Sequence, residues 1–114
     1  MFPDDENGDV LRRMVSDGDD LSKPRDIDFV VVFSQEAAAS LFADQIRQMG
    51  HQVTVDRTDT AEGFPWDARV VRYMVPEHGA ISHFESQLAE LAAHHGGRND
   101  GWGCFSVPVV PDED

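Results

Sequence analysis

The feature that most constrains the fold is one uninterrupted apolar run, Phe29-Val30-Val31-Val32-Phe33. Its β-branched and aromatic residues favour a strand, and successive residues of a strand point to opposite faces of the sheet. Because every position of the run is apolar, neither face of this strand suits water, which is typical of a strand buried among others. We therefore predict a strand over Asp26–Phe33 that lies in the centre of its sheet.

Hydrophobic periodicity separates the remaining helices from the remaining strands. The predicted strands are His51–Arg57, Trp66–Val75 and a last one at about Trp102–Val107. The predicted helices are a short one over Gly8–Val15 that ends at Asp17-Gly18, one from an N-cap at Ser34 to Gly50, and one from Pro76 and Glu77 to Gly96-Gly97.

After the opening helix, the order strand, helix, strand, strand, helix, strand predicts an α+β, ferredoxin-like βαββαβ sandwich. In this sandwich two helices cover one face of a four-stranded antiparallel sheet, and the N-terminal helix is an addition. A chain of 114 residues is long enough for one core and too short for two. We expect a single domain over 1–114, with its core at about 8–107 and a short acidic tail at 108–114.

The charge of the chain restricts its partners. Asp and Glu number 22 against 9 Lys and Arg, so the formal net charge is -13. Such a surface repels phosphate backbones and anionic membranes, which disfavours direct binding to nucleic acid or to a membrane. It attracts basic proteins, including the Arg- and Lys-rich segments that hold RNA. The alternative is that the acidity serves only solubility.

Residues for chemistry are sparse. His83, Glu90 and His94 share a helix face but span too great a length to hold one ion, so we expect a solvated face, no metal and no cofactor. The single Cys104 fits a reducing compartment, and we expect it to be buried and inert. The chain shows neither a signal peptide nor an apolar stretch of membrane-spanning length, which predicts a cytoplasmic protein.

The candidate binding residues are acidic or aromatic. Acidic residues flank Lys23-Pro24-Arg25 in a predicted surface loop, where they could form an acidic ledge for a basic partner. The alternative is that Asp17 to Asp20 only end the helix, while Lys23 and Arg25 satisfy local carboxylates or strand ends. Trp102 lies between two glycines, either as an aromatic anchor at an interface or as a seal for the sheet edge. The full candidate set is Asp17, Asp19, Asp20, Asp26, Asp100 and Trp102.

Three segments together resemble the family of regulators of ribonuclease E activity B (RraB). They are Gly8–Met14, the stretch from Asp17 to Asp28 and Asp100-Gly101-Trp102-Gly103, and the resemblance spans about Phe2–Phe105. It implies an α+β sandwich and a small acidic protein that inhibits ribonuclease E by binding it, without catalysis. We expect a monomer or weak homodimer. The alternative is a ferredoxin-like domain that binds or senses a small molecule as a dimer.

Overall fold

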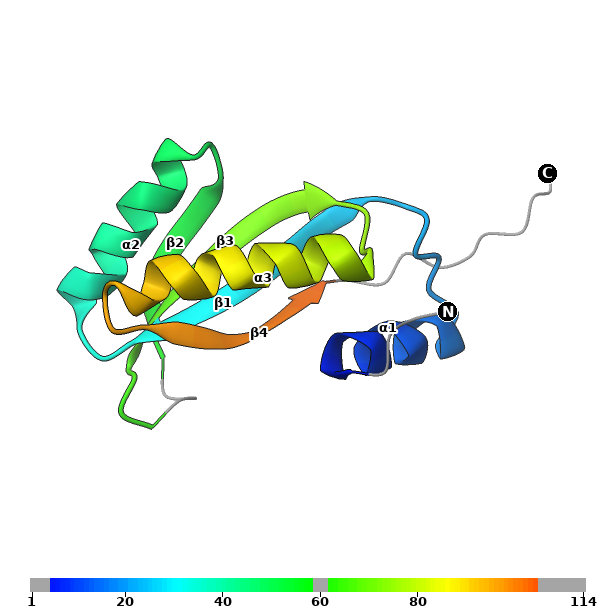
Figure 1. The fold of residues 1–114 in the computed structure, drawn as a ribbon, viewed down its shortest axis with the longest axis horizontal. Helices are drawn as coiled ribbons and strands as arrows, with labels where there is room; N and C mark the ends of the chain where they lie inside the picture. Colours follow the sequence, from blue (N-terminus) through cyan, green and yellow to red (C-terminus); the bar gives the residue numbers. More distant parts are fainter. Residues whose placement is uncertain (1–4, 59–61, 105–114) are drawn as a thin grey trace.

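The computed structural model describes residues 5–58 and 62–104. Within these ranges the chain forms three helices and a four-stranded antiparallel sheet (Figure 1), which confirms the predicted α+β class. In chain order the elements are α1 (Glu6–Ser16), β1 (Arg25–Phe33), α2 (Glu36–Gln48), β2 (Gln52–Arg57), β3 (Trp66–Met74), α3 (His78–Ala93) and β4 (Arg98–Cys104). The predicted end of the last strand at Val107 and the acidic tail at 108–114 lie outside the described residues.

The strand that carries the apolar run is central, as predicted. The strands are ordered β2-β3-β1-β4, and β1 pairs with β3 on one side and with β4 on the other. β2 and β3 pair as an antiparallel hairpin, in which Val53 lies opposite Val70. Among the described residues, β2 and β4 are therefore the two edges of the sheet.

One face of the sheet packs against both long helices. Phe29 and Phe33 are four residues apart on β1, so their side chains point to the same face. The ring of Phe29 meets Phe84 of α3 edge-on at a centroid distance of 4.8 Å, and the ring of Phe33 meets Phe42 of α2 at 5.1 Å. All four rings are buried, and burying each one is worth about 1.5–3 kcal/mol. Figure 1 shows the two helices on this side of the strands.

The two long helices begin in different ways. Glu77 caps α3, because its carboxylate accepts hydrogen bonds from the backbone N–H groups of Gly79 and Ala80. The prediction that Ser34 caps α2 is wrong. Two residues separate β1 from α2, and the second of them, Gln35, occupies the N-cap position without a side-chain capping bond.

α2 ends just before Gly50, the glycine from which its end was predicted. Gly50 has a φ of +93°, in the left-handed region that favours glycine. Its N–H bonds to the carbonyl of Arg47 at 3.0 Å, and the N–H of His51 bonds to the carbonyl of Ile46 at 3.3 Å. These two bonds form a Schellman motif, which satisfies carbonyl groups at the end of the helix.

The last strand begins earlier than predicted. β4 starts at Arg98, soon after the glycines that end α3, and not at Trp102. The polar residues from Arg98 to Gly101 indicate a loop in the sequence. In the structure they belong to the strand, with a β-bulge at Asp100 where the register with β1 shifts. Gly101 completes the bulge with a φ of +119°, which explains the glycine before the tryptophan.

The N-terminal helix is attached to the side of the domain. α1 packs against α3, and Leu11 on its inner face is fully buried. The helix ends at Asp17 and Gly18, as predicted. Across the described part of the chain, no helix combines the length and the apolar character that a membrane span requires.

Candidate partner-binding surfaces

A buried ion pair lies beneath the loop at 17–24. Nη1 of Arg25 lies 2.8 Å from each carboxylate oxygen of Asp19, and the two side chains are 5% and 0% exposed. Arg25 also donates to the backbone carbonyls of Asp20 and Lys23. A buried charge must be paired and hydrogen-bonded, and all of these partners of Arg25 lie in the loop. The bonds therefore hold the loop against the start of β1. The expectation that Asp19 lies on an exposed ledge is therefore wrong.

The other three acids of the predicted ledge lie apart. Asp17 is exposed at the C-cap of α1, and Asp26 is exposed on β1, on the sheet face opposite α2 and α3. Asp20 is half-buried and accepts hydrogen bonds from the hydroxyl and the backbone N–H of Ser22, at 2.6 and 3.1 Å. These two bonds hold the pKa of Asp20 below its usual range. The loop is thus organised chiefly by its own hydrogen bonds.

Asp100 and Trp102 do share a site. They border a hollow of about 390 Å³ between α1, α3 and β4. Its lining consists of Glu6, Asn7, Val10, Glu85, Asn99, Asp100, Gly101 and Trp102. Three of these side chains are carboxylates and none is basic, so this lining favours a cation. The indole ring adds to this preference, because an aromatic face attracts ammonium and guanidinium groups.

Asn7 of α1 connects to both α3 and β4 at the side of this hollow. Its Nδ2 donates to Ser82 Oγ at 3.0 Å and to Glu85 Oε1 at 2.8 Å, both on α3. Its Oδ1 accepts from Nε1 of Trp102 at 2.9 Å. The indole N–H is therefore satisfied within the fold, and Trp102 fastens α1 to β4 while its ring lines the hollow.

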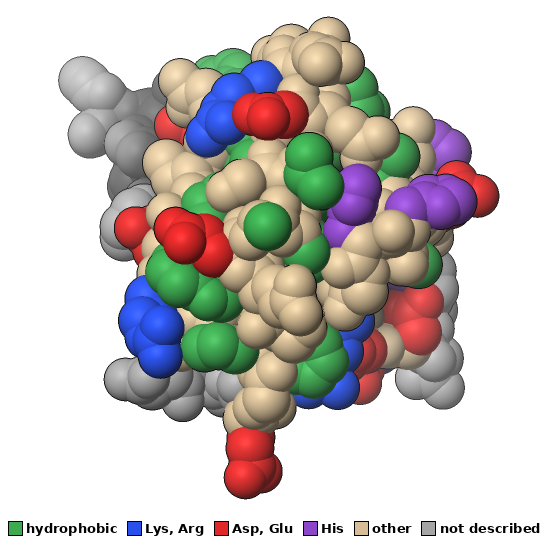
Figure 2. Space-filling model, turned by 90° about the vertical axis from the view of Figure 1, so that its left-hand side faces the viewer, with side chains coloured by type: hydrophobic (Ala, Val, Ile, Leu, Met, Phe, Trp, Pro, Cys, Tyr) green, Lys and Arg blue, Asp and Glu red, His purple; other side chains and the backbone are tan. Residues whose placement is uncertain are grey.

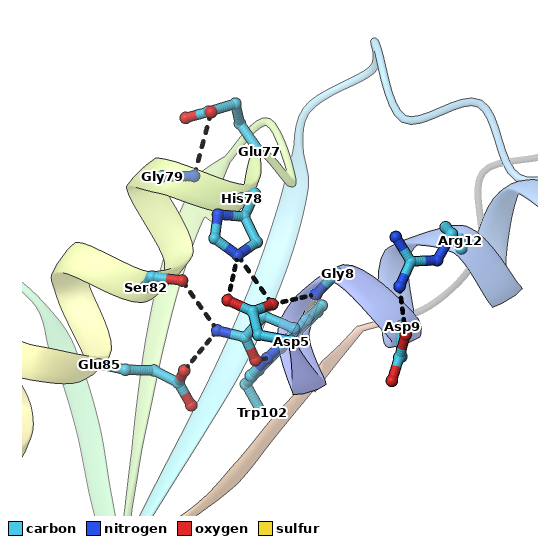
Figure 3. Close-up of polar contacts among 11 residues, drawn as sticks. Asp5, Gly8, Asp9, Arg12, Glu77, His78, Gly79, Ser82, Glu85 and Trp102 are labelled. Carbon is cyan, nitrogen blue, oxygen red and sulfur yellow. Dashed lines mark hydrogen bonds and ion pairs between the residues drawn. The ribbon is translucent and has the colours of Figure 1, made fainter. Parts of the chain in front are cut away.

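A second contact fastens the start of α1. Asp5 caps the helix by accepting from the backbone N–H of Gly8 at 2.8 Å, and its two oxygens lie 3.0 and 2.9 Å from Nε2 of His78 (Figure 3). The bond from Gly8, followed by that from His78, holds the pKa of Asp5 below its usual range. The first turns of α1 and α3 are thus joined.

Burial shifts the pKa values of Cys104 and His51 in opposite directions. Burial is the main cause that raises the pKa of the Cys104 thiol, which reduces the fraction of the nucleophilic thiolate. Burial, followed by the charge of Arg72, lowers the pKa of His51, whose ring packs on Phe84 at 5.2 Å. Among the residues that the structure describes, no group of three or more His, Cys, Asp or Glu side chains could hold a metal ion.

The end of the molecule formed by α2 and the last turn of α3 has a different character. Figure 2 shows histidine side chains gathered on one side of this end, with acidic side chains standing apart from one another. Nε2 of His95 lies 3.0 Å from Oε1 of Gln45, which links α3 to α2. This end therefore suits a cationic partner less well than the hollow beside Trp102.

Sequence reasoning missed one residue that organises these surfaces. Asn7 stood among acidic residues before a helix, and nothing in its position predicts contacts with residues more than seventy positions away. The alternative in which Arg25 satisfies a local carboxylate is confirmed by its pairing with Asp19. The burial of that pair agrees with the place of Arg25 at the start of a buried strand, where a charged side chain needs a partner.

One comparison identifies relatives of this chain. A family model described as regulator of ribonuclease activity B, RraB, matches residues 4–104. No curated protein matches the chain. The match covers nearly the whole sequence, so the resemblance seen in the three sequence segments is confirmed.

Proposed function

This chain belongs to the RraB family of regulators of ribonuclease activity, and we propose that it binds ribonuclease E and inhibits it without catalysing a reaction. The match over residues 4–104 is the observation that carries this proposal, because it includes every helix and strand of the domain. Inhibition of this kind would slow RNA turnover by lowering the concentration of free ribonuclease E.

The charge supports a physical mechanism for the inhibition. With a net charge of -13, the chain is attracted to the Arg- and Lys-rich segments through which a ribonuclease holds RNA. A chain bound to such a segment occupies the cations that RNA phosphates need. Exposed charges reach only about 10 Å at 0.1 M salt, so binding and inhibition should both weaken as salt is added.

The hollow beside Trp102 is one contact that fits such a partner. Glu6 and Asp100 are exposed at its rim, and Glu85 lies half-buried inside it. We propose that it receives one arginine or lysine side chain, which would pair with these carboxylates and lie against the indole ring. Asp17 and Asp20 then contribute through the general field of the acidic surface, Asp26 offers an exposed carboxylate on the sheet, and Asp19 serves the fold.

We also propose a specific fold type for the domain. Read from the β4 edge, the strand order is β4-β1-β3-β2, with α2 and α3 against one face. We propose that this is the ferredoxin-like arrangement, built as one domain over 1–114. We further propose that the chain acts in the cytoplasm as a monomer or weak homodimer.

The test is a cleavage assay with purified ribonuclease E and a fluorescent RNA substrate, read with increasing amounts of this chain at low and at high salt. We expect inhibition that saturates at low salt and fades at high salt, with the same salt dependence for direct binding. Cleavage that is unaffected at low salt, with no complex by analytical ultracentrifugation, would refute the proposal.

A matched pair of variants tests the hollow. Glu6→Gln with Asp100→Asn removes two charges at its rim, and Asp44→Asn with Glu90→Gln removes two exposed charges elsewhere on the helices. Both pairs change the net charge equally, so the general field falls by the same amount. We expect the rim pair alone to weaken binding about tenfold, which corresponds to about 1.4 kcal/mol. Equal effects would remove the hollow from the binding site.

A further inference from the structure

The sheet face opposite α2 and α3, which we call the open face, has side chains that the proposed hollow does not use. The pairing register places Asp28 of β1 between Val71 of β3 and Gly103 of β4, and Val30 between Arg69 and Gly101. Because β-strand side chains alternate, all of these positions share one face. The open face includes Asp26, Asp28, Val30, Asp56, Asp67, Arg69, Val71, Tyr73 and Gly103.

Gly103 is the residue on this face that the fold does not explain. Gly101 needs its positive φ, and a Cβ on Gly97 would collide with the ring of Phe33. Gly103 has neither constraint: its φ is outside the left-handed region, and no atom of the described residues lies within 4 Å of a Cβ built there. A glycine inside a strand costs stability and often marks a place where another backbone approaches closely.

The open face is also partly apolar and hollowed. Tyr73 is 68% exposed, and Val30 and Val71 are half-buried. A hollow of about 550 Å³ extends across the strands, from Val71 past Asp28 to Gly103. An exposed tyrosine beside half-buried aliphatic side chains is typical of a protein interface, where tyrosine is enriched.

The charge of this face selects a basic occupant. Asp28 pairs with Arg69 at 3.1 Å, while Asp26 is exposed beside Tyr73 in the pairing register. Farther along the face, Asp56 and Asp67 are directly opposite each other on β2 and β3. Like charges at opposed positions destabilise a sheet, although here the Asp67 carboxylate also accepts a hydrogen bond from the backbone of Asp56. Even with Arg98 opposite Val32 counted, carboxylates outnumber cations on this face, so it disfavours RNA.

We propose that the open face is the docking surface for a basic segment of the protein partner, whose backbone passes over Gly103. Tyr73 and Val71 pack against the apolar part of that segment, and its arginine or lysine side chains pair with Asp26 and with the carboxylates of β2 and β3. This inference rests on the proposed function, because it names the second surface through which the chain would hold ribonuclease E.

Substitutions that change shape without lowering stability provide the test. Gly103→Val adds a side chain where the partner's backbone would pass, and it suits a strand better than glycine does. Its control is Ala93→Val, which enlarges an exposed residue of α3. Tyr73→Ser removes the exposed ring, and its control is Leu41→Ser on α2, where the leucine is 56% exposed. Each variant is compared with the wild-type chain for stability in urea and for affinity to ribonuclease E.

We expect Gly103→Val and Tyr73→Ser each to lower the affinity about tenfold or more, with both controls near wild type and Gly103→Val at least as stable. If the wild-type chain binds ribonuclease E and these two variants bind equally well, the docking surface is refuted and the proposed function stands. A wild-type dimer that Gly103→Val converts to monomers would also refute it, in favour of self-association through this face.

A second measurement tests whether the open face binds a basic segment without relying on ribonuclease E as the partner. The isotope-labelled chain is titrated with an oligo-arginine peptide at low salt, and its amide chemical shifts are followed by NMR. Shift changes centred on Val30, Val71 and Gly103 support the open face whatever the partner is. Additional changes at Asn7 and Trp102 would report the hollow proposed above, whereas changes confined to those two residues, or spread evenly over the acidic surface, overturn the open face.

Discussion

The ion pair between Asp19 and Arg25 supports a quantitative prediction. Breaking a buried pair by neutralising one partner costs about 3–5 kcal/mol, because the remaining charge is left without compensation. Here the cost is reduced, since Arg25 keeps its bonds to the carbonyls of Asp20 and Lys23 and an asparagine keeps one oxygen. We expect Asp19→Asn to lower the free energy of unfolding by about 2–3 kcal/mol, out of a total on the order of 5–15 kcal/mol.

Urea unfolding followed by far-UV circular dichroism measures this loss. A slope of roughly 1.5–2 kcal/mol per molar urea converts it into a fall of the midpoint by about 1–2 M. Asp17→Asn, an exposed acid two residues away, is the matched control and should leave the midpoint in place. Replacing both partners, as in Asp19→Leu with Arg25→Met, should recover much of the loss. A midpoint for Asp19→Asn within about 0.3 M of wild type, at an equal slope, would refute the reasoning.

Three further predictions follow from other contacts. Gly97→Ala should cost about 1–3 kcal/mol in the same urea assay, because its Cβ would overlap the ring of Phe33; an unchanged midpoint would contradict this packing. A hydrogen bond from the backbone and a histidine partner lower the pKa of Asp5, so its contribution is present above its unfolded pKa and lost as pH falls through the lower folded value. Asp5→Asn should therefore make stability less sensitive to pH below about pH 4, and an equally steep fall in the variant would count against it. Asn7→Ala should raise amide hydrogen exchange throughout α1 while leaving the central strands protected, and exchange identical to wild type would show that α1 is held by other contacts.

The elements could be predicted because their signals are local. The apolar run at Phe29–Phe33 specified a central strand, and Gly50 marked the end of a helix through its own backbone conformation. The start of β4 was missed for a local reason as well. Asn99 and Asp100 are polar residues next to a glycine, a pattern typical of a turn, and only the pairing with β1 reveals a bulged strand.

The site could be predicted only in part, because side-chain partners depend on tertiary contacts. Asp100 and Trp102 lie together because they are two residues apart on one strand. Asp19 was grouped with its exposed neighbours, although the turn after α1 points its carboxylate inward to Arg25. Asn7 reaches its partners only once α1 has packed on α3. Spacing along the sequence does not contain this information.

Shape and charge contribute differently to the recognition that we propose. The chain has 22 acidic residues, so carboxylates occur on many surfaces and one neutralisation changes a net charge of -13 by a single unit. Such a change acts mainly on the association rate and on its salt dependence. A side chain added at Gly103 leaves the charge untouched and obstructs close approach, so it should act on the dissociation rate. Rate constants measured for Gly103→Val and for Asp17→Asn, which neutralises an exposed acid outside the open face, can therefore separate docking on the open face from attraction to an acidic protein in general.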